Sequence, residues 1–251
     1  LASRFVQQAE RYGVELLPAV GVAAISTEDG RSVVRTTTGQ ELHAAAVLVA
    51  TGSTYRRTGA EGEDDLIGAG IHFCATCDGP FYRGVPEVVV IGGGNSGFEE
   101  GLFLTQFAEH VTIVVRTEPI ASRLLQDKVA AHPRITVLTG TEVTGFVADD
   151  HGKLMSLRLR SGDEETEHPA SAAFVFVGLD PNTGWLGGSL ALDDRGFVDT
   201  DRMMQSSVRG VFAAGDVRSG STKQLASAVG EGAAVALQIR AHIEELRDGT
   251  A

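Results

Sequence analysis

Two cysteines placed two residues apart are the most reactive side chains that this sequence brings together. Cys74 and Cys77 are the only cysteines among 251 residues, and they lie in the stretch HFCATCDG, residues 72–79. Such a pair can ligate a metal, form a structural disulfide or act as a redox couple. Asp78 directly follows the second cysteine, so a redox couple here would have a carboxyl group beside it to give or take a proton.

The remaining composition narrows these three interpretations. A structural zinc site needs four ligands, and neither a second CxxC nor a spaced histidine pair accompanies Cys74, Cys77 and His72, so no metal site is predicted. Two cysteines are also too few for the disulfide framework of a secreted protein. The net charge of −12 disfavours nucleic-acid binding, and no apolar run approaches the roughly 20 residues that span a bilayer. We therefore expect a cytoplasmic globular protein that binds neither nucleic acid nor membrane.

The glycine loop of a βαβ pattern begins thirteen residues after Gly79 (92 − 79). The apolar run 85–91 (VPEVVVI) predicts a buried parallel strand, residues 96–110 predict a helix, and residues 111–115 (VTIVV) predict a second strand. Between the first strand and the helix lies GGGNSG, in which Gly92, Gly94 and Gly97 fit GxGxxG and enclose Asn95 and Ser96. In this context the motif predicts a loop that binds a dinucleotide pyrophosphate at the helix N-terminus.

The residue after the second strand bears on which nicotinamide cofactor is bound. An acidic residue there would hydrogen-bond the 2′-hydroxyl of NAD, whereas this chain has Arg116, with Arg123 seven positions later. An arginine suits the 2′-phosphate of NADP, because its guanidinium group forms charge-assisted bidentate hydrogen bonds. The alternative is a solvated arginine at a strand end, and Glu118 nearby keeps that alternative open.

An internal repeat predicts two domains of like design. The segments that start at Val14 and at Ile135 each read as a short strand, a link, two further strands around an acidic-Gly turn, and a terminal apolar strand, at 47–50 and 174–177. In the second copy Gly92 precedes Ile135 by 43 positions (135 − 92), so the matching glycine loop of the first copy would fall before residue 1. We therefore expect that about 30 residues containing a first βα turn precede this chain, ahead of a helix over 1–13.

A second ligand signal lies near the C-terminus. Residues 210–217 (GVFAAGDV) predict a strand that breaks at Gly215 and exposes Asp216 at its carboxyl end, followed by a helix over 225–246. Open α/β sheets bind ligands at this edge, and an aspartate there can accept a hydrogen bond from a ribose or ribityl hydroxyl. A turn or capping role for Asp216 is the alternative.

Taken together, CATCDG, VVVIGGGNSGFEE, VATGS and GVFAAGDV with KQL closely resemble the low-molecular-weight thioredoxin reductase family, over essentially the whole chain. The resemblance implies an α/β fold of two Rossmann-like, three-layer nucleotide-binding domains with β-meander crossovers. It places an FAD domain at 1–56 and 181–251, and an NADPH domain carrying the cysteine pair at 57–180. It further implies a homodimer, and joints near Gly52–Gly59 and Gly178–Asn182 that act as hinges.

The same resemblance assigns roles to individual residues. It implies that Cys74 and Cys77 form a redox-active disulfide, with Cys77 toward the flavin, Cys74 attacking thioredoxin, and Asp78 as acid and base. The glycine loop and Arg116, with Arg123 as a substitute for a missing arginine, would bind NADPH. The chain departs from the family at Val115-Arg116-Thr117, where His-Arg-Arg is common, at Gly97, where alanine is usual, and at Lys223, where arginine is common. The residues expected to contact FAD are Thr51, Gly52, Gly215, Asp216, Lys223, Gln224 and Leu225.

Two other readings of the pattern stay open at this point. The first is a related flavin-dependent reductase or oxidase that acts on another disulfide or dithiol, such as that of a peroxiredoxin. The second is a nucleotide-binding redox sensor without catalytic activity, whose disulfide reports the state of the thiol pool.

Overall fold

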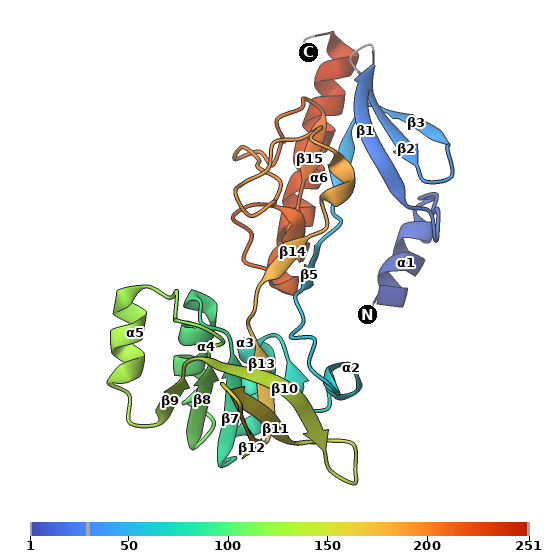
Figure 1. Ribbon diagram of the computed structural model, residues 1–251. Coiled ribbons are helices and arrows are strands. Elements are labelled where there is room, and N and C mark those ends of the chain that lie inside the picture. Colours follow the sequence, from blue (N-terminus) through green and yellow to red (C-terminus); the bar gives the residue numbers. More distant parts are fainter. Residues whose placement is uncertain (1, 29–30, 250–251) are drawn as a thin grey trace. The chain divides into compact units, whose positions relative to one another are not determined.

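The computed structural model describes residues 2–28 and 31–249 (Figure 1). Contacts between residues divide the chain into two compact units: the discontinuous unit, residues 1–54 with 180–251, and the inserted unit, residues 55–179. The chain passes between them along two strands that pair with each other, β5 (Ser53–Tyr55) and β14 (Leu179–Pro181). Which cofactor each unit binds stays a prediction.

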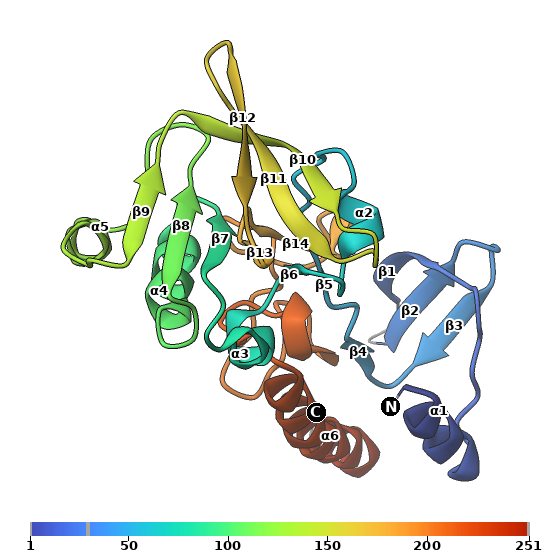
Figure 2. The same ribbon diagram turned by 90° about the horizontal axis from the view of Figure 1, so that it is seen from below.

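The inserted unit is built around a five-stranded parallel sheet (Figure 2). Its strands, in spatial order, are β6 (Ile71–His72), β13 (Ala172–Val175), β7 (Glu87–Ile91), β8 (His110–Val114) and β9 (Ile135–Leu138). Helices α4 (Asn95–Leu104) and α5 (Arg123–Ala130) pack on one face. The antiparallel meander β10 (Thr141–Ala148), β11 (Leu154–Ser161) and β12 (Glu164–Pro169) packs on the other.

Residues 88–91 of the strand β7 are apolar without interruption because both faces of the strand are covered. Val88 and Val90 pack in the cluster that includes Phe98 of α4, whereas Val89 and Ile91 pack against the meander. Because successive side chains of a strand point to opposite faces, a strand covered on both faces needs apolar residues at every position. Two one-turn helices, α2 (Glu63–Leu66) and α3 (Ala75–Asp78), and the 3₁₀ helix Gly79–Tyr82 complete the unit.

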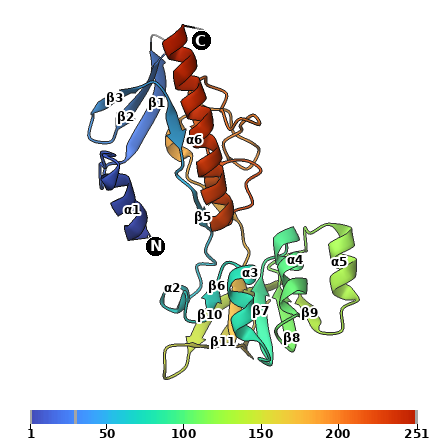
Figure 3. The ribbon, with the colours of Figure 1, turned by 180° about the vertical axis from the view of Figure 1, so that it is seen from behind.

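The discontinuous unit has the same layered design on a smaller sheet. Its parallel strands β4 (Val47–Val49) and β15 (Val211–Ala213) lie between the long helix α6 (Leu225–Asp248; Figure 3) and a meander. Phe212 packs toward Val235 of α6, whereas Val211 and Ala213 pack on the other side with Ile25. The meander comprises β1 (Val22–Glu28), β2 (Arg31–Thr36) and β3 (Glu41–Ala44), and α1 (Ala2–Arg11) precedes it. Two 3₁₀ helices, Gly184–Leu186 and Gly215–Val217, complete the described part.

The fold-class prediction is confirmed, because the chain forms parallel sheets with helices on one face and a β-meander on the other. Two local predictions are wrong. The short strand expected at Val14 is not a strand, since the described chain offers it no parallel partner equivalent to the β8 strand that pairs with β9. The helix expected over 96–110 ends at Leu104, where the Thr105 hydroxyl donates to the Leu102 carbonyl (2.7 Å) and turns follow.

The described residues contain no helix that is both long and apolar enough to span a bilayer.

Candidate active site

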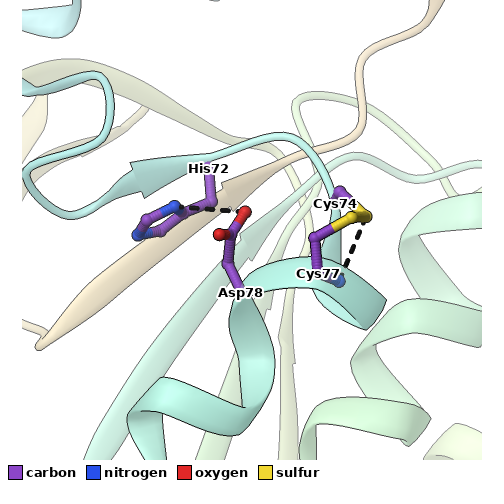
Figure 4. Close-up of a disulfide and its surroundings, with 4 residues drawn as sticks. All are labelled: His72, Cys74, Cys77 and Asp78. Carbon is purple, nitrogen blue, oxygen red and sulfur yellow. Dashed lines mark hydrogen bonds and ion pairs between the residues drawn. A yellow bond between two sulfur atoms is a disulfide. The ribbon is translucent and has the colours of Figure 1, made fainter. Parts of the chain in front are cut away.

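The two cysteines form a disulfide at the carboxyl end of the edge strand β6 (Figure 4). Their Cα atoms are 5.3 Å apart, within the usual range for a disulfide. Cys74 caps the N-terminus of α3, and the Cys77 backbone N–H donates to Cys74 Sγ at 3.2 Å. This N–H would stabilise a thiolate at Cys74 when the disulfide is reduced.

Asp78, the last residue of α3, lies beside this disulfide. Its backbone N–H donates to the Cys74 carbonyl at 3.1 Å, which fixes the turn. Its carboxylate points toward the imidazole ring of His72, with Oδ2 3.4 Å from Nδ1 (Figure 4). Cys74, Cys77 and Asp78, the residues expected to do the chemistry, are therefore brought together by one turn of chain.

Two residues of this site were not expected from the sequence. His72 was considered only as a metal ligand, and Tyr82 was not considered, yet His72 Nε2 lies 2.6 Å from the Tyr82 hydroxyl oxygen. Burial lowers the pKa of His72, against the opposing effect of Asp78, and burial also raises the pKa of Tyr82. The only sequence signal for His72 is its position two residues before Cys74.

The residue between His72 and Cys74 is held by the start of the inserted unit. The Phe73 ring stacks on Tyr55 of β5, with ring centroids 5.1 Å apart. The Arg57 guanidinium carbon lies 4.8 Å from the Phe73 ring centroid, a cation–π distance. The chain entering the unit therefore contacts the residue next to the disulfide.

The glycine loop between β7 and α4 has the backbone geometry that its motif requires. Gly92 has a φ of 144°, and a Cβ there would collide with the Phe176 carbonyl oxygen. A Cβ at Gly97 would collide with the Gly92 carbonyl oxygen, so the close approach of helix to loop needs glycine. A Cβ at Gly94 would meet no protein atom within 4 Å, which leaves that side open to a ligand.

The two arginines expected at the 2′-phosphate lie on the next loop, after β8. Arg116 is exposed, whereas Arg123 begins α5 and pairs with Asp127 at 3.0 Å. This loop is tied to the glycine loop, because the Gly93 carbonyl accepts from the N–H groups of Ile120 (2.9 Å) and Ala121 (3.0 Å).

The two polar residues inside the glycine motif differ in their surroundings. The side-chain Oδ1 of Asn95 accepts from the Ser122 N–H at 2.7 Å, so this group joins the two loops. Ser96 is exposed at the start of α4, where the helix N–H groups are not bonded within the helix.

A separate cavity of about 210 Å³ lies in the discontinuous unit, where the carboxyl ends of β4 and β15 meet the first turns of α6. Asp216 Oδ1 is buried here without a hydrogen-bond partner. A buried acceptor without a partner at this edge fits a ligand hydroxyl. The lining residues are Leu48, Ala50, Gly52, Ala214, Gly215, Asp216, Ala228 and Gly232.

The other residues expected at the flavin are not among those that line this cavity. Thr51 is paired with Asn182 through two hydrogen bonds, of 2.9 and 2.8 Å. The Lys223 amine donates to the carbonyls of Asp216 (2.8 Å) and Arg218 (2.7 Å), so it holds the loop before α6. Gln224 caps α6, and Leu225, its first residue, has an exposed side chain.

Sequence reasoning did not find the carboxylate that supports this loop. Glu231 of α6 accepts from the Gly215 N–H (2.8 Å) and forms a two-point ion pair with Arg218 (2.8 and 3.1 Å). The Arg218 guanidinium holds the pKa of Glu231 below its usual range. Glu231 lies within α6 and outside every sequence motif, so no local pattern in the sequence points to it.

Among residues 2–28 and 31–249, no three His, Cys, Asp or Glu side chains are grouped so that they could hold a metal ion.

Comparison with known proteins gives a consistent picture. Residues 4–232 match the family described as pyridine nucleotide-disulphide oxidoreductase. The thioredoxin reductase of Peptoclostridium litorale is 36% identical, over 98% of this chain and 79% of its own length. The thioredoxin reductase of Streptomyces clavuligerus is 38% identical, over 96% of this chain and 75% of its own length.

Solved structures agree with these relatives. The crystal structure of thioredoxin reductase from Streptococcus pyogenes superposes with a TM-score of 0.89 at 32% identity, covering 97% of this chain and 79% of that one. The thioredoxin reductase from Giardia duodenalis gives the same TM-score at 30% identity, covering 96% and 80%. With its disulfide, its glycine loop and these matches, the chain belongs to the pyridine nucleotide-disulphide oxidoreductases and, within them, to the thioredoxin reductase family.

Proposed function

We propose that this oxidoreductase is an NADPH-dependent thioredoxin-disulfide reductase that uses FAD and the Cys74–Cys77 disulfide. The observation that carries the proposal is the disulfide, with Asp78 beside it, in the same compact unit as a dinucleotide-binding glycine loop. A structural disulfide would need neither the adjacent carboxyl group nor the nucleotide loop.

NADPH binding is supported by the backbone of the β7–α4 turn. The N–H groups at the start of α4 and the open side of Gly94 can receive a pyrophosphate. Arg116, exposed at the end of β8, can receive the 2′-phosphate. Arg123 is the second candidate, and its guanidinium would have to exchange Asp127 for the phosphate.

FAD binding is supported by the cavity at the β4 and β15 ends. Asp216 would accept a hydrogen bond from a flavin side-chain hydroxyl, since its Oδ1 is buried without a partner. Gly52 and Gly215 line the same cavity. When bound, FAD supplies hydride acceptance from NADPH and two-electron transfer to a disulfide. Thr51, Lys223 and Glu231 would shape this cavity through the backbone groups that they hold.

The cysteines would then act by thiol–disulfide exchange. In the reduced pair, the Cys74 thiolate attacks one sulfur of the thioredoxin disulfide, which breaks that S–S bond and forms a mixed disulfide. The Cys77 thiolate next attacks Cys74 Sγ, so the Cys74–Cys77 bond re-forms and thioredoxin leaves as a dithiol. Asp78 takes the proton from the attacking thiol or gives one to the departing thiolate.

Two observations bear differently on which cysteine attacks. Cys77 is the more exposed residue, which favours Cys77 as the sulfur that a partner reaches. The Cys77 N–H, however, donates to Cys74 Sγ and would stabilise a thiolate at Cys74 only. We give this hydrogen bond more weight than the exposure of Cys77, because the attacking species is a thiolate and the bond stabilises a thiolate at Cys74.

We further propose that the protein is a cytoplasmic homodimer. The helix α6 exposes Leu225, Val229 and Leu237, with 63, 53 and 66% of their surfaces accessible. An apolar stripe of this kind on a long helix is suited to contact with a second copy.

The test is NADPH oxidation by the purified protein, with thioredoxin and, separately, with a disulfide-form peroxiredoxin as acceptor. We expect bound flavin, thioredoxin-dependent NADPH oxidation, and loss of that activity in both Cys74→Ser and Cys77→Ser. In the Cys77→Ser variant the mixed disulfide with thioredoxin cannot go forward, because Cys77 no longer attacks Cys74 Sγ and only the released thioredoxin thiol can reverse the step. Oxidation of NADPH with the peroxiredoxin alone, or with neither acceptor, would contradict the proposal.

A further inference from the structure

Three polar side chains form a line that ends beside the disulfide. The Tyr82 hydroxyl oxygen lies 2.6 Å from His72 Nε2, and His72 Nδ1 lies 3.4 Å from Asp78 Oδ2. Figure 4 shows His72 and Asp78 directed at each other next to the Cys74–Cys77 bond. The imidazole ring thus connects the carboxyl group of the site to a phenol behind it.

The ring of His72 is held in place by the sheet. His72 ends β6 and stands in register with Phe174 of β13, the next strand. The rings of His72 and Phe174 have centroids 5.4 Å apart, and Tyr82 meets the same Phe174 edge-on at 5.9 Å. Phe174 is fully buried and the His72 side chain is only 11% exposed, so neither ring is free to turn away.

The surroundings determine which ring nitrogen of His72 carries the proton. Burial lowers the pKa of His72, so the ring is neutral in neutral solution and has one N–H. A carboxylate oxygen accepts hydrogen bonds, so the ring nitrogen that faces Asp78 is the one that carries the proton, as Nδ1–H. Nε2 is then the unprotonated nitrogen, and the Tyr82 hydroxyl donates to it.

We propose that His72 is a positioning residue for Asp78, holding its carboxyl group beside the disulfide through an Nδ1–H that Tyr82 fixes from behind. When Asp78 gives its proton to a cysteine thiolate, a thiol and a carboxylate result. The Nδ1–H group stabilises this carboxylate, and water returns a proton to it, since the Asp78 side chain is one-third exposed (33%). The inference rests on the proposed redox use of Cys74 and Cys77.

Few titratable groups can make the Tyr82–His72–Asp78 line depend on pH. The titratable side chains that face the ring among the described residues are Asp78 and Tyr82, while β13 contributes the uncharged Phe174. As pH falls through the depressed pKa of His72, the ring gains a second proton on Nε2 and Tyr82 must cease to donate there. The pH dependence of the rate of disulfide reduction therefore reports the protonation of His72.

The experiment measures how fast dithiothreitol reduces the Cys74–Cys77 disulfide in the full chain, from acidic to alkaline pH, by alkylation of the released thiols and mass spectrometry. For His72→Ala we expect a reduction rate on the order of tenfold lower at neutral pH. This loss is smaller than the loss expected when the proton donor itself is removed. The pH profile of this variant should also lose the inflection that the parent protein shows below the ordinary pKa range of histidine. His72→Asn should restore most of the rate without the inflection, because its amide N–H can replace Nδ1–H.

His110→Asn is the matched control. His110 also joins a carboxylate and a hydroxyl, at 2.8 Å from Glu87 and 3.1 Å from Thr136, but it does so at the amino edge of the same sheet. Its replacement should leave the reduction rate and its pH profile unchanged. Tyr82→Phe should give an intermediate rate, and it carries the test if His72→Ala does not fold.

The proposal is overturned if His72→Ala or Tyr82→Phe matches the parent protein at every pH, if His72→Asn is as slow as His72→Ala, or if His110→Asn is slowed equally. Because dithiothreitol needs neither NADPH nor thioredoxin, this result is independent of the activity assay. Failure of thioredoxin reduction alone would defeat the proposed function and leave the role of His72 standing.

Discussion

Asn95, inside the glycine motif, and Ser122, at the end of the loop between β8 and α5, are joined by a hydrogen bond of 2.7 Å from the Ser122 N–H to the Asn95 side-chain oxygen. The bond ties the start of α4 to the loop that carries Arg116 and Arg123. If the two loops bind NADPH as proposed, Asn95 would influence the position of the arginine loop through this bond.

Replacing Asn95 by alanine should loosen the arginine loop. We expect a KM for NADPH raised on the order of three- to tenfold with kcat little changed, in line with a net hydrogen bond of about 1 kcal/mol. Steady-state kinetics checks this. Thr144→Ala, which removes a side-chain hydrogen bond to the Arg158 carbonyl in the meander, is the control and should stay near the parent; an equal rise in KM for both variants would contradict this role.

Replacing Arg116 by alanine should reduce the preference for NADPH over NADH. A charge-assisted hydrogen bond to the 2′-phosphate corresponds to a loss on the order of ten- to a hundredfold in the ratio of kcat/KM values. Arg123→Ala should have a smaller effect, since that guanidinium already pairs with Asp127. Arg160→Ala, an exposed arginine paired with Glu142 in the meander, serves as control. An unchanged ratio in Arg116→Ala would remove this arginine from the 2′-phosphate site.

Replacing Glu231 by glutamine should destabilise the protein in a pH-dependent way. The pKa of Glu231 is lowered by Arg218, so its contribution is present above the ordinary glutamate pKa and is lost as pH falls through the depressed value. We expect a loss of about 2–4 kcal/mol in the free energy of unfolding at neutral pH, shrinking in acid, because one partner of a largely buried pair is removed.

Urea unfolding at several pH values measures this loss. Glu244→Gln, from the exposed pair with Arg240 on the same helix, is the control and should cost less than about 1 kcal/mol. A Glu231→Gln loss that stays constant from neutral to acidic pH would show that the ion pair is not its source.

Gly59, expected from the sequence to be part of a hinge, is fixed by a buried carboxylate. Its φ is 76°, and its N–H donates to Glu63 at 2.8 Å, while Glu63 is 3% exposed and also accepts from Thr58. Gly59→Pro should therefore lower the free energy of unfolding by about 2–4 kcal/mol, through the lost bond and the forbidden φ.

Gly59→Ala keeps the N–H and separates these two causes. It should cost only about 1–2 kcal/mol, the strain of a left-handed residue with a Cβ. Denaturant unfolding of both variants provides the measurement. If the proline variant were as stable as the parent and only turned over more slowly, that result would support the predicted hinge at Gly59 and contradict this expected loss of stability.

Much of the architecture could be predicted because it depends on local patterns. The apolar residues 88–91 of β7 and the glycines that follow them define a strand, a tight turn and a helix within a few residues. The strand expected at Val14 could not be judged in this way, because a strand forms only if a partner lies beside it. The end of α4 at Leu104 has no marker in the apolar pattern, which continues to Phe107, and the turns that follow it are seen only in the structure.

In the site, too, contacts between sequence neighbours could be predicted, whereas contacts made by the fold could not. Cys74, Cys77 and Asp78 are neighbours in the sequence, so their proximity was expected. Glu231 reaches Gly215 across sixteen positions (231 − 215), and only the fold makes that contact. His72 was visible in the sequence, but its partner Tyr82 depends on the 3₁₀ helix that turns the phenol back onto β6.

The stack of Phe73 on Tyr55 has a mechanical consequence. Tyr55 is the residue at which the chain enters the inserted unit, and Phe73 is bonded directly to Cys74. A change in the path of the entering strand must either break the stack or pull on the backbone of the first cysteine. The contact between these two rings, eighteen positions apart in the sequence (73 − 55), therefore couples the position of the entering strand to the position of Cys74.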